Sequence, residues 1–246
     1  MKKLQGSTAV IIGGSGGIGA ATARSLAGAG AAVVVTYRGG EAAARALIAE
    51  LPGQGHAALP ASVEDSASLN ALAAKVRETR GRCDILVNSA GFTKAVPHND
   101  LDALDDAFLD RMWAVNWRGP FAAVRAFRPL LEEAEGLVVN ISSIGGLNGS
   151  GSNLAYAALK AATDSMTKSL ARALAPKVRA MSISPGIVET GFVPGRGPEQ
   201  NAKIAPSIPL KRVALPEDVA EAVLACATLL TYSTGSVLLV DGGRAL

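Results

Sequence analysis

Tyr156 and Lys160 are the two residues whose types and spacing most directly suggest chemistry. They stand four residues apart in the stretch NLAYAALKAATDSMTKSLARALA, which has the composition of a helix, and residues four apart share one helix face. A free tyrosine has a pKa near 10, so only about one in a thousand is ionised at pH 7. A cation within about 4–6 Å lowers the pKa of an acid by roughly 1–3 units. The pair therefore predicts a proton donor and acceptor near neutral pH, although the same spacing also occurs on ordinary helix surfaces.

Five glycines fall within the segment Gly13–Gly19, directly after the apolar run TAVII. Glycine inside an ordinary element costs about 0.5–1 kcal/mol relative to alanine, so the cluster indicates a close approach that side chains would block. The segment contains GxGxxG at positions 14, 16 and 19 and GxxxGxG at positions 13, 17 and 19. Between a strand and a helix, such a turn predicts a dinucleotide whose phosphates lie at the helix N-terminus. A tight turn without a ligand is the alternative. A P-loop is disfavoured, because no Lys-Ser/Thr pair follows the glycines.

The end of the second apolar run indicates which dinucleotide is bound. The residues there are Thr36, Tyr37 and Arg38, with no acidic side chain of the kind that holds the ribose hydroxyls of NAD. A guanidinium can bind a 2′-phosphate through two parallel hydrogen bonds. Arg38 therefore favours NADP over NAD, unless it merely points into solvent.

Short apolar runs recur along the chain and alternate with Ala- and Leu-rich segments of helical spacing. The runs are TAVIIGG, AAVVVTY, HAALPAS, DILVNSAG, GLVVNISS, VRAMSIS and SVLLVDGG. Several are continuous and β-branched, as strands buried on both faces are. The alternation predicts one α/β domain over residues 1–246, a doubly wound parallel sheet (a Rossmann fold) of about seven strands with helices on both faces.

The segment 191–209 has no clear period and is rich in Pro and Gly. A loop of this length within a compact domain is usually functional. We expect it to be a lid that orders over a substrate and excludes water, with a plain connector as the alternative.

Composition argues against several classes of protein. The 246 residues are 49% hydrophobic, with a formal net charge of +3 and scattered basic residues, which argues against disorder and nucleic-acid binding. Cys83 and Cys226 lie far apart, and His56 and His98 cannot form a multi-His centre, so no metal site is expected. The stretch Met1–Gly14 has too short an apolar segment for a secretory signal, and no apolar run approaches the roughly 20 residues that span a bilayer. We expect a cytoplasmic protein with no membrane partner.

Further motifs place Tyr156 in a recognisable order. Ser143 in NISSIGG stands thirteen residues before Tyr156, and Asn116 lies in WAVNWRG. With IIGGSGGIG, NSAG, SPGIVET and the final VDGG, the sequence resembles the classical short-chain dehydrogenase/reductase family over nearly its whole length. Among members of that family, it is most similar to the 3-oxoacyl-carrier-protein reductases. Four of the motif residues each follow a predicted strand, at the strand ends where an open parallel sheet binds ligands: Gly13, Asn88, Ser143 and Pro185.

The resemblance implies a role for each residue of the candidate site. Tyr156 would be the acid/base that protonates the carbonyl oxygen, and Lys160 would lower its pKa and bind the nicotinamide ribose. Ser143 would hydrogen-bond the substrate oxygen, with Ser142 as a weaker alternative, and Asn116 would hold a water that relays protons. With the glycine motif included, the positions expected to bind the cofactor are Gly13, Ser15, Gly16, Gly17, Ile18, Gly19, Arg38, Ser62, Val63, Asn88, Ala90, Gly91, Tyr156, Lys160, Pro185, Gly186, Val188 and Thr190.

The resemblance implies an NADP(H)-dependent reductase that converts a ketone or a 3-oxoacyl group into a secondary alcohol, and a homotetramer. Three departures from the family pattern matter: Ile12 replaces the usual threonine, Ser62 stands where an aspartate normally contacts adenine, and Gly16 occupies a position that is often basic in NADP-dependent members. Arg172 suits the docking of an acidic acyl carrier, but the segment LLEEAEG is acidic where basic residues are expected, which disfavours such a partner. The alternatives are an NAD-dependent dehydrogenase of a sugar, steroid or other secondary alcohol and a non-catalytic nucleotide-binding scaffold.

Overall fold

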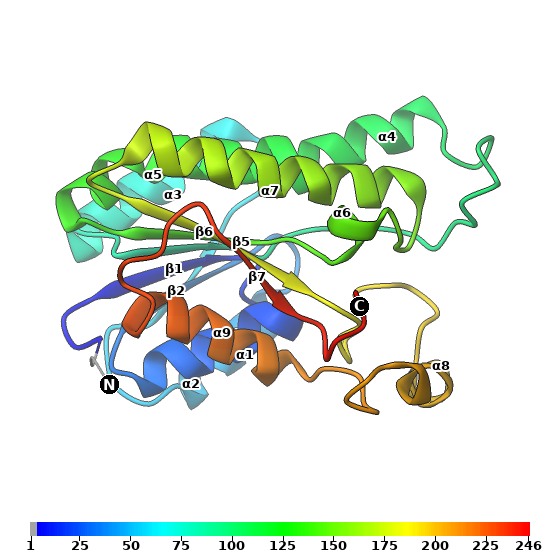
Figure 1. Cartoon of the computed structure of the whole chain (residues 1–246). Coiled ribbons are helices and arrows are strands. Elements are labelled where there is room, and N and C mark those ends of the chain that lie inside the picture. Colours follow the sequence, from blue (N-terminus) through cyan, green and yellow to red (C-terminus); the bar gives the residue numbers. More distant parts are fainter. Residues whose placement is uncertain (1–3) are drawn as a thin grey trace.

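The central element is a seven-stranded sheet in which every neighbouring pair is parallel (Figure 1). The structure is a computed structural model that describes residues 4–246. Residues 1–3 of the N-terminal stretch Met1–Gly14 lie outside the described residues. The strand order is β3-β2-β1-β4-β5-β6-β7. The strands are β1 (Thr8–Ile12), β2 (Ala32–Tyr37), β3 (Ala57–Pro60), β4 (Ile85–Asn88), β5 (Leu137–Ile141), β6 (Arg179–Pro185) and β7 (Val237–Val240). The predicted doubly wound parallel sheet is confirmed.

Helices cover both faces of the sheet (Figure 1). They are α1 (Gly17–Gly28), α2 (Glu41–Glu50), α3 (Ser66–Arg80), α4 (Asp106–Trp113), α5 (Gly119–Ala134), α6 (Gly145–Asn148), α7 (Leu154–Leu174), α8 (Pro198–Ile204) and α9 (Pro216–Thr228). In Figure 1, α1, α2 and α9 lie below the sheet, and α3, α4, α5 and α7 lie above it. The sheet is therefore buried on both faces, which is why its central strands are continuous apolar runs rather than alternating ones.

Alternate residues of each central strand feed two separate cores. On β1, which is buried along its whole length, Ile11 packs in the core shared with α1, α2 and α9, and Val10 and Ile12 pack in the core shared with α3, α5 and α7. Successive side chains of a strand point to opposite faces, so both cores depend on the same short strand. Such a strand holds the turn that follows it in a fixed position.

The strand order reverses between β1 and β4, because successive crossovers run in one direction to β3 and in the other to β7. In an open α/β sheet, ligands bind outside the carboxyl ends of the strands at this reversal. The glycine turn follows β1, and the other motif-bearing turns follow β4, β5 and β6. The topology therefore gathers at one edge the residues that the sequence singled out.

Two segments differ from a simple reading of the sequence. The stretch 191–209 is not wholly irregular, since it contains α8 and a short 3₁₀ turn, Ala205–Ser207. Pro198 opens α8, where its missing N–H costs nothing, and the N–H of Gly197 donates to Gln200 Oε1 at 3.1 Å.

Between α4 and α5 the chain makes a π turn, Ala114–Arg118, a feature often found at functional sites.

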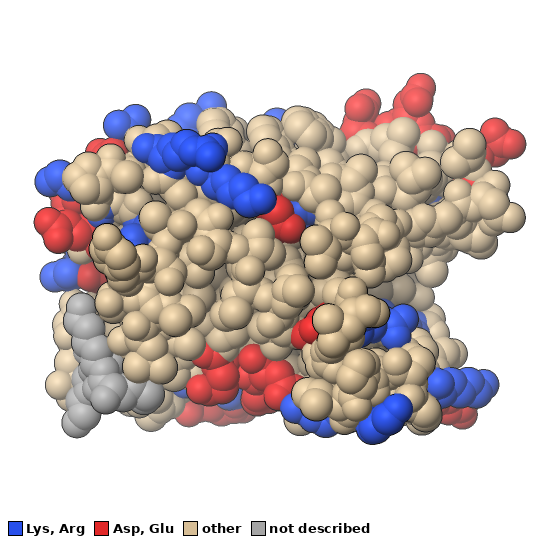
Figure 2. Space-filling model, viewed as in Figure 1, with Lys and Arg blue, Asp and Glu red and all other residues tan. Residues whose placement is uncertain are grey.

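On the face in Figure 2, basic and acidic atoms are interspersed, with an acidic group over the start of α4, where Asp102, Asp105 and Asp106 are exposed. Within residues 4–246, no helix is both long enough and apolar enough to cross a bilayer. In the same range, no three His, Cys, Asp or Glu side chains gather closely enough to hold a metal ion.

Candidate active site

A cavity of about 810 Å³ lies at the carboxyl ends of the strands. Most of the residues singled out from the sequence line it, from the glycine turn to the segment after β6. The predicted residues that line the cavity are Gly13, Ser15, Gly16, Gly17, Ile18, Arg38, Ser62, Val63, Ala90, Gly91, Ser143, Tyr156, Lys160, Pro185, Gly186, Val188 and Thr190. The topology therefore brings most of the predicted site together from several distant stretches of chain.

Asn88 does not line the cavity. Its side chain is buried beneath the edge of the sheet, where Nδ2 donates to Asn140 Oδ1 at 2.9 Å, and Asn140 Nδ2 donates in turn to Thr167 Oγ1 at 2.8 Å. This chain of amides links β4, β5 and α7. The side chain of Asn88 therefore joins β4 to β5 instead of facing the cavity.

Asn116 and Gly19 also lie outside the cavity lining. Asn116 is buried in the π turn; its Nδ2 donates to the carbonyls of Met112 and Phe92, both at 3.0 Å, and its Oδ1 accepts from the N–H of Phe92 at 3.2 Å. Asn116 thus fixes the backbone at Phe92, which does line the cavity. Gly19 acts through packing within the glycine turn and not through its own surface.

Helix α7 carries Tyr156 and Lys160, and its start is fixed locally. Asn153 caps the helix, because its Oδ1 accepts from the N–H of Tyr156 at 2.8 Å, while its Nδ2 donates to the carbonyl of Lys94 at 2.9 Å. An N-cap of this kind satisfies one of the orphan N–H groups of the first turn. The cap therefore fixes the start of α7, and with it Tyr156, against the segment after β4.

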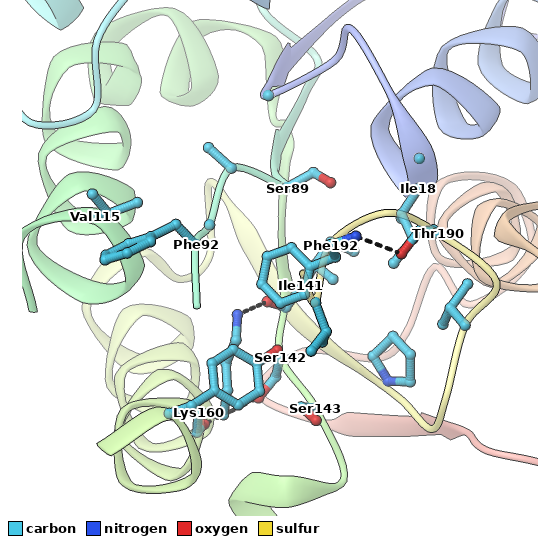
Figure 3. Close-up of a pocket in the computed structure, with 18 of the residues that line it drawn as sticks. Ile18, Ser89, Phe92, Val115, Ile141, Ser142, Ser143, Lys160, Thr190 and Phe192 are labelled. Atoms are coloured by element: carbon cyan, nitrogen blue, oxygen red, sulfur yellow. Dashed lines mark hydrogen bonds between the residues drawn. The ribbon is translucent and has the colours of Figure 1, made fainter. Parts of the chain in front are cut away.

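The two serines after β5 have different partners. Ser142 is buried, and its Oγ donates to the carbonyl of Lys160 at 3.0 Å, which holds α7 against the sheet. Ser143 Oγ accepts from the N–H of Gly145 at 3.1 Å, so its own proton is not used in that bond. Figure 3 shows both serines beside Lys160. The geometry supports Ser143, rather than Ser142, as the hydroxyl available to a ligand.

Burial decides the acidity of Tyr156. Its pKa is raised to about 12, chiefly because its surroundings exclude water, while a hydrogen bond with Ser143 and the positive charge of Arg196 act in the opposite direction. A phenol in this state holds its proton throughout the neutral range. In this structure Tyr156 is therefore a proton donor and not a phenolate.

Lys160 lies beside Tyr156 and is held at the end of β5. Its ammonium is buried, Nζ donates to the carbonyl of Ile141 at 2.7 Å (Figure 3), and it lies 5.5 Å from the centre of the Tyr156 ring. Burial lowers the pKa of Lys160 to about 8. Burial of the phenol dominates the pKa of Tyr156 in this structure, so the expectation that Lys160 makes Tyr156 more acidic stays a prediction.

The glycine turn has the geometry of a phosphate cradle. Gly13 has a φ of +80°, and a Cβ there would lie 2.6 Å from the backbone nitrogen of Ala90. No side chain caps α1 and no acidic residue lies in its first turn, so its N-terminal N–H groups and partial positive charge face the cavity unopposed. The described residues that line the cavity include five Arg or Lys side chains and no Asp or Glu. These features fit an anionic dinucleotide.

Ile12 stands where the family usually has a threonine, and a different residue supplies a hydroxyl to the glycine turn. The N–H of Gly13 donates to Thr36 Oγ1 at 3.0 Å, so a hydroxyl at the end of β2 holds the turn that follows β1. The side chain of Ile12 is buried in the core.

Arg38 lines the cavity and is paired with a carboxylate in this structure. Its guanidinium contacts Glu64, which also accepts from Arg111 Nε at 3.2 Å. Arg118 Nη2 holds the same segment by donating to the backbone carbonyl of Glu64 at 3.0 Å. A 2′-phosphate would have to compete with Glu64 for Arg38. Nothing in the sequence indicated this partner, since Glu64 lies 26 residues further along the chain.

Several further lining residues were not singled out from the sequence, among them Phe92, Phe192 and Arg196. Phe192 packs against Tyr156 with ring centroids 5.8 Å apart, and Arg111 lies over the ring of Phe92 at 4.6 Å. Figure 3 shows Phe92 on the segment after β4 and Phe192 on the segment after β6. The position of Phe192, just after the SPGIVET motif, is a signal that could have identified it.

The fold and the cavity define a nucleotide-dependent oxidoreductase. The chain belongs to the short-chain dehydrogenase/reductase family, close to the 3-oxoacyl-carrier-protein reductases, and acts on CH–OH or C=O groups. Residues 13–245 match the family model described as Enoyl-(Acyl carrier protein) reductase.

Individual relatives agree with this assignment. The 3-oxoacyl-[acyl-carrier-protein] reductase of Aquifex aeolicus is 34% identical over 246 residues, which cover 98% of each chain. A blue fluorescent protein from a metagenomic library, solved in complex with NADPH, has a TM-score of 0.90 and 32% identity, covering 99% of this chain and 100% of that one. The 3-ketoacyl-(acyl-carrier-protein) reductase of Brucella melitensis, complexed with NADH, has a TM-score of 0.91 and 31% identity over the same shares of the two chains.

Proposed function

We propose that this enzyme uses NADPH to reduce a ketone or a 3-oxoacyl group to a secondary alcohol. The observation that carries the proposal is the convergence of Ser143, Tyr156 and Lys160 on one cavity that also contains the glycine turn. A panel of ketones and 3-oxoacyl thioesters, followed by the absorbance of NADPH and NADH, tests it. Turnover confined to alcohols with NAD⁺ would favour a dehydrogenase instead, and binding of NADPH without any turnover would favour the scaffold.

Each residue of the site has a separate role in the proposed reaction. The nicotinamide of the bound cofactor supplies the hydride. Ser143 Oγ donates a hydrogen bond to the substrate carbonyl oxygen, and the Tyr156 hydroxyl gives that oxygen its proton. The Lys160 ammonium, beside the Tyr156 ring, stabilises the negative charge that develops on the phenol oxygen. The segment 191–209 contributes Phe192 and Arg196 to the lining and closes over the substrate.

Arg38 gives the preference for NADPH. We expect Arg38→Met to weaken NADPH binding by about 10–100-fold and NADH binding by less than about twofold, because a charge-assisted hydrogen bond to a phosphate contributes about 1.5–3 kcal/mol. Fluorescence titration with each cofactor measures both constants. Arg24→Met is the matched control, since Arg24 pairs with Glu50 and is not among the cavity residues. Equal losses for NADPH and NADH would remove Arg38 from the recognition of the 2′-phosphate.

The pH dependence of the two directions follows from the pKa values of Tyr156 and Lys160. Lys160 is charged below a pKa of about 8, so kcat/KM for reduction should be level below about pH 8 and fall above it. Oxidation should rise with pH, because Tyr156, whose pKa is about 12, must first lose its proton. Profiles of kcat/KM in both directions test this. A fall in reduction already complete below pH 7 would assign the titration to another group.

A further inference from the structure

Five cations line the cavity in the part of the chain that the structure describes, and three of them already have a function or a partner. Arg38 and Arg111 both contact Glu64, and Lys160 belongs to the proposed acid/base pair. The other two, Arg196 and Arg244, have no carboxylate within 4 Å among residues 4–246, since every ion pair found there involves other residues. The cavity therefore has more positive charge than its own chain neutralises.

Arg196 is the better placed of these two cations to meet a substrate. Both arginines are half-buried. Arg196 belongs to the segment 191–209, whereas Arg244 Nη1 already donates to Oγ of the exposed Ser207 at 3.2 Å. Arg196 lines the same cavity as Tyr156, and it follows Phe192, whose ring packs against that of Tyr156 with centroids 5.8 Å apart. The segment that carries the guanidinium therefore contacts the group that would protonate the substrate.

The hydrogen bonding of Arg196 is incomplete. Its Nη2 donates to the carbonyl of Val188 at 3.3 Å, and its Nε is buried with no partner among the described residues. Burial also lowers the pKa of Arg196 from its ordinary value. A partly buried guanidinium with an unsatisfied donor is unfavourable unless a ligand provides an acceptor. Its planar fork is matched best by a carboxylate.

Apolar side chains line the same cavity as Arg196. Phe92, Ile144, Phe192 and Val193 contribute hydrophobic surface to the same cavity. A ligand that fits would have a hydrocarbon body and one anionic end. The start of α1 is the cradle expected for the phosphates of a dinucleotide, and Arg196 belongs to a different segment of the lining.

We propose that Arg196 selects carbonyl substrates that carry a carboxylate, so that the preferred substrate class of the enzyme is the oxo acids. This inference rests on the proposed function, because the carbonyl carbon of the acid must lie at Ser143 and Tyr156. The carboxylate accepts two hydrogen bonds from Arg196, and the carbon chain between the two groups lies against the aromatic rings.

Kinetics on matched substrates test the proposal. 4-Oxopentanoate and 5-oxohexanoate are compared with their methyl esters, which keep the ketone but lose the charge. We expect the unaltered enzyme to favour the acids, and Arg196→Met to lower kcat/KM for them by about 10–100-fold with a change of less than about threefold for the esters. Arg196→Lys should recover part of the loss, since it keeps the charge but not the fork. Lys203→Met, an exposed lysine on α8 outside the cavity lining, is the control for loss of charge in the same segment.

A binding measurement separates this inference from the proposed function. Calorimetry compares cyclohexanecarboxylate with cyclohexanecarboxamide on the NADPH-loaded protein, and requires no turnover. Binding of the carboxylate at least about tenfold more tightly, lost in Arg196→Met, supports the inference even if no oxo acid in the panel is reduced. Equal binding of the acid and the amide overturns it. A tenfold loss of NADPH affinity in Arg196→Met, with acids and esters affected equally, also overturns it and assigns the guanidinium to the cofactor.

Discussion

Tyr156→Phe is expected to reduce every accepted carbonyl compound about 10²–10⁴-fold more slowly than the unaltered enzyme. The substitution removes only the hydroxyl, which is the group placed to give the substrate oxygen its proton. The ring keeps its contact with Phe192, so the shape of the cavity and the binding of NADPH should be retained. Single-turnover measurements of NADPH oxidation isolate the chemical step, and a fluorescence titration confirms that the cofactor still binds.

Two variants make the Tyr156 experiment interpretable. Tyr232→Phe removes the same atom from a fully exposed tyrosine and should leave the rate unchanged. Ser143→Ala should lower the rate while leaving the proton donor in place, because a hydrogen bond to the substrate oxygen is lost. Full turnover by Tyr156→Phe would falsify the acid/base assignment and leave the scaffold or another proton donor as the explanation.

The second large effect is expected at Gly19. A Cβ at this position would lie 2.3 Å from the carbonyl oxygen of Gly13 and 2.9 Å from the Cα of Gly14. Both are backbone atoms that cannot move without displacing the turn. We expect Gly19→Ala to lower the free energy of unfolding by about 3 kcal/mol, the upper end of the usual cost of overpacking. NADPH binding should weaken with it, because the same turn forms the phosphate cradle.

Gly16→Ala is the matched control in the same turn. A Cβ at Gly16 meets no atom within 4 Å, and its φ of −163° is open to any residue. Its free energy of unfolding should change by less than about 0.5 kcal/mol. Urea unfolding of the three proteins without cofactor, at one protein concentration, measures both changes. Equal stability of Gly19→Ala and Gly16→Ala would show that the turn relaxes freely and that its glycines are not sterically required.

The strands and the edge at which the site lies could be predicted from the sequence because their causes are local. β1, β4 and β5 are continuous apolar runs, since each is buried on both faces. Parallel strands end at the same edge, so Gly13 and Ser143 had to meet there once the alternation of elements was recognised. The helical spacing of Tyr156 and Lys160 likewise depends only on the helix that carries them.

The parts of the site that could not be predicted depend on packing between distant segments. The pKa of Tyr156 is set by burial, which no spacing in α7 encodes. Asn116 was expected at the cavity, but the π turn directs its side chain to the backbone of Phe92. Arg196 lies in a segment without periodicity, so its place in the lining follows only from how that segment packs against the rest of the site.

The buried ammonium of Lys160 has a cost that extends beyond the reaction. Its pKa is about 8 in the folded protein and 10.5 in its ordinary state, so between these values the unfolded chain binds more protons and folding becomes more favourable as the pH rises. Below about pH 8 the penalty is present in full. The enzyme therefore keeps the Lys160 ammonium in its site at a cost in the free energy of unfolding at neutral pH. Selection for activity would preserve such a cost.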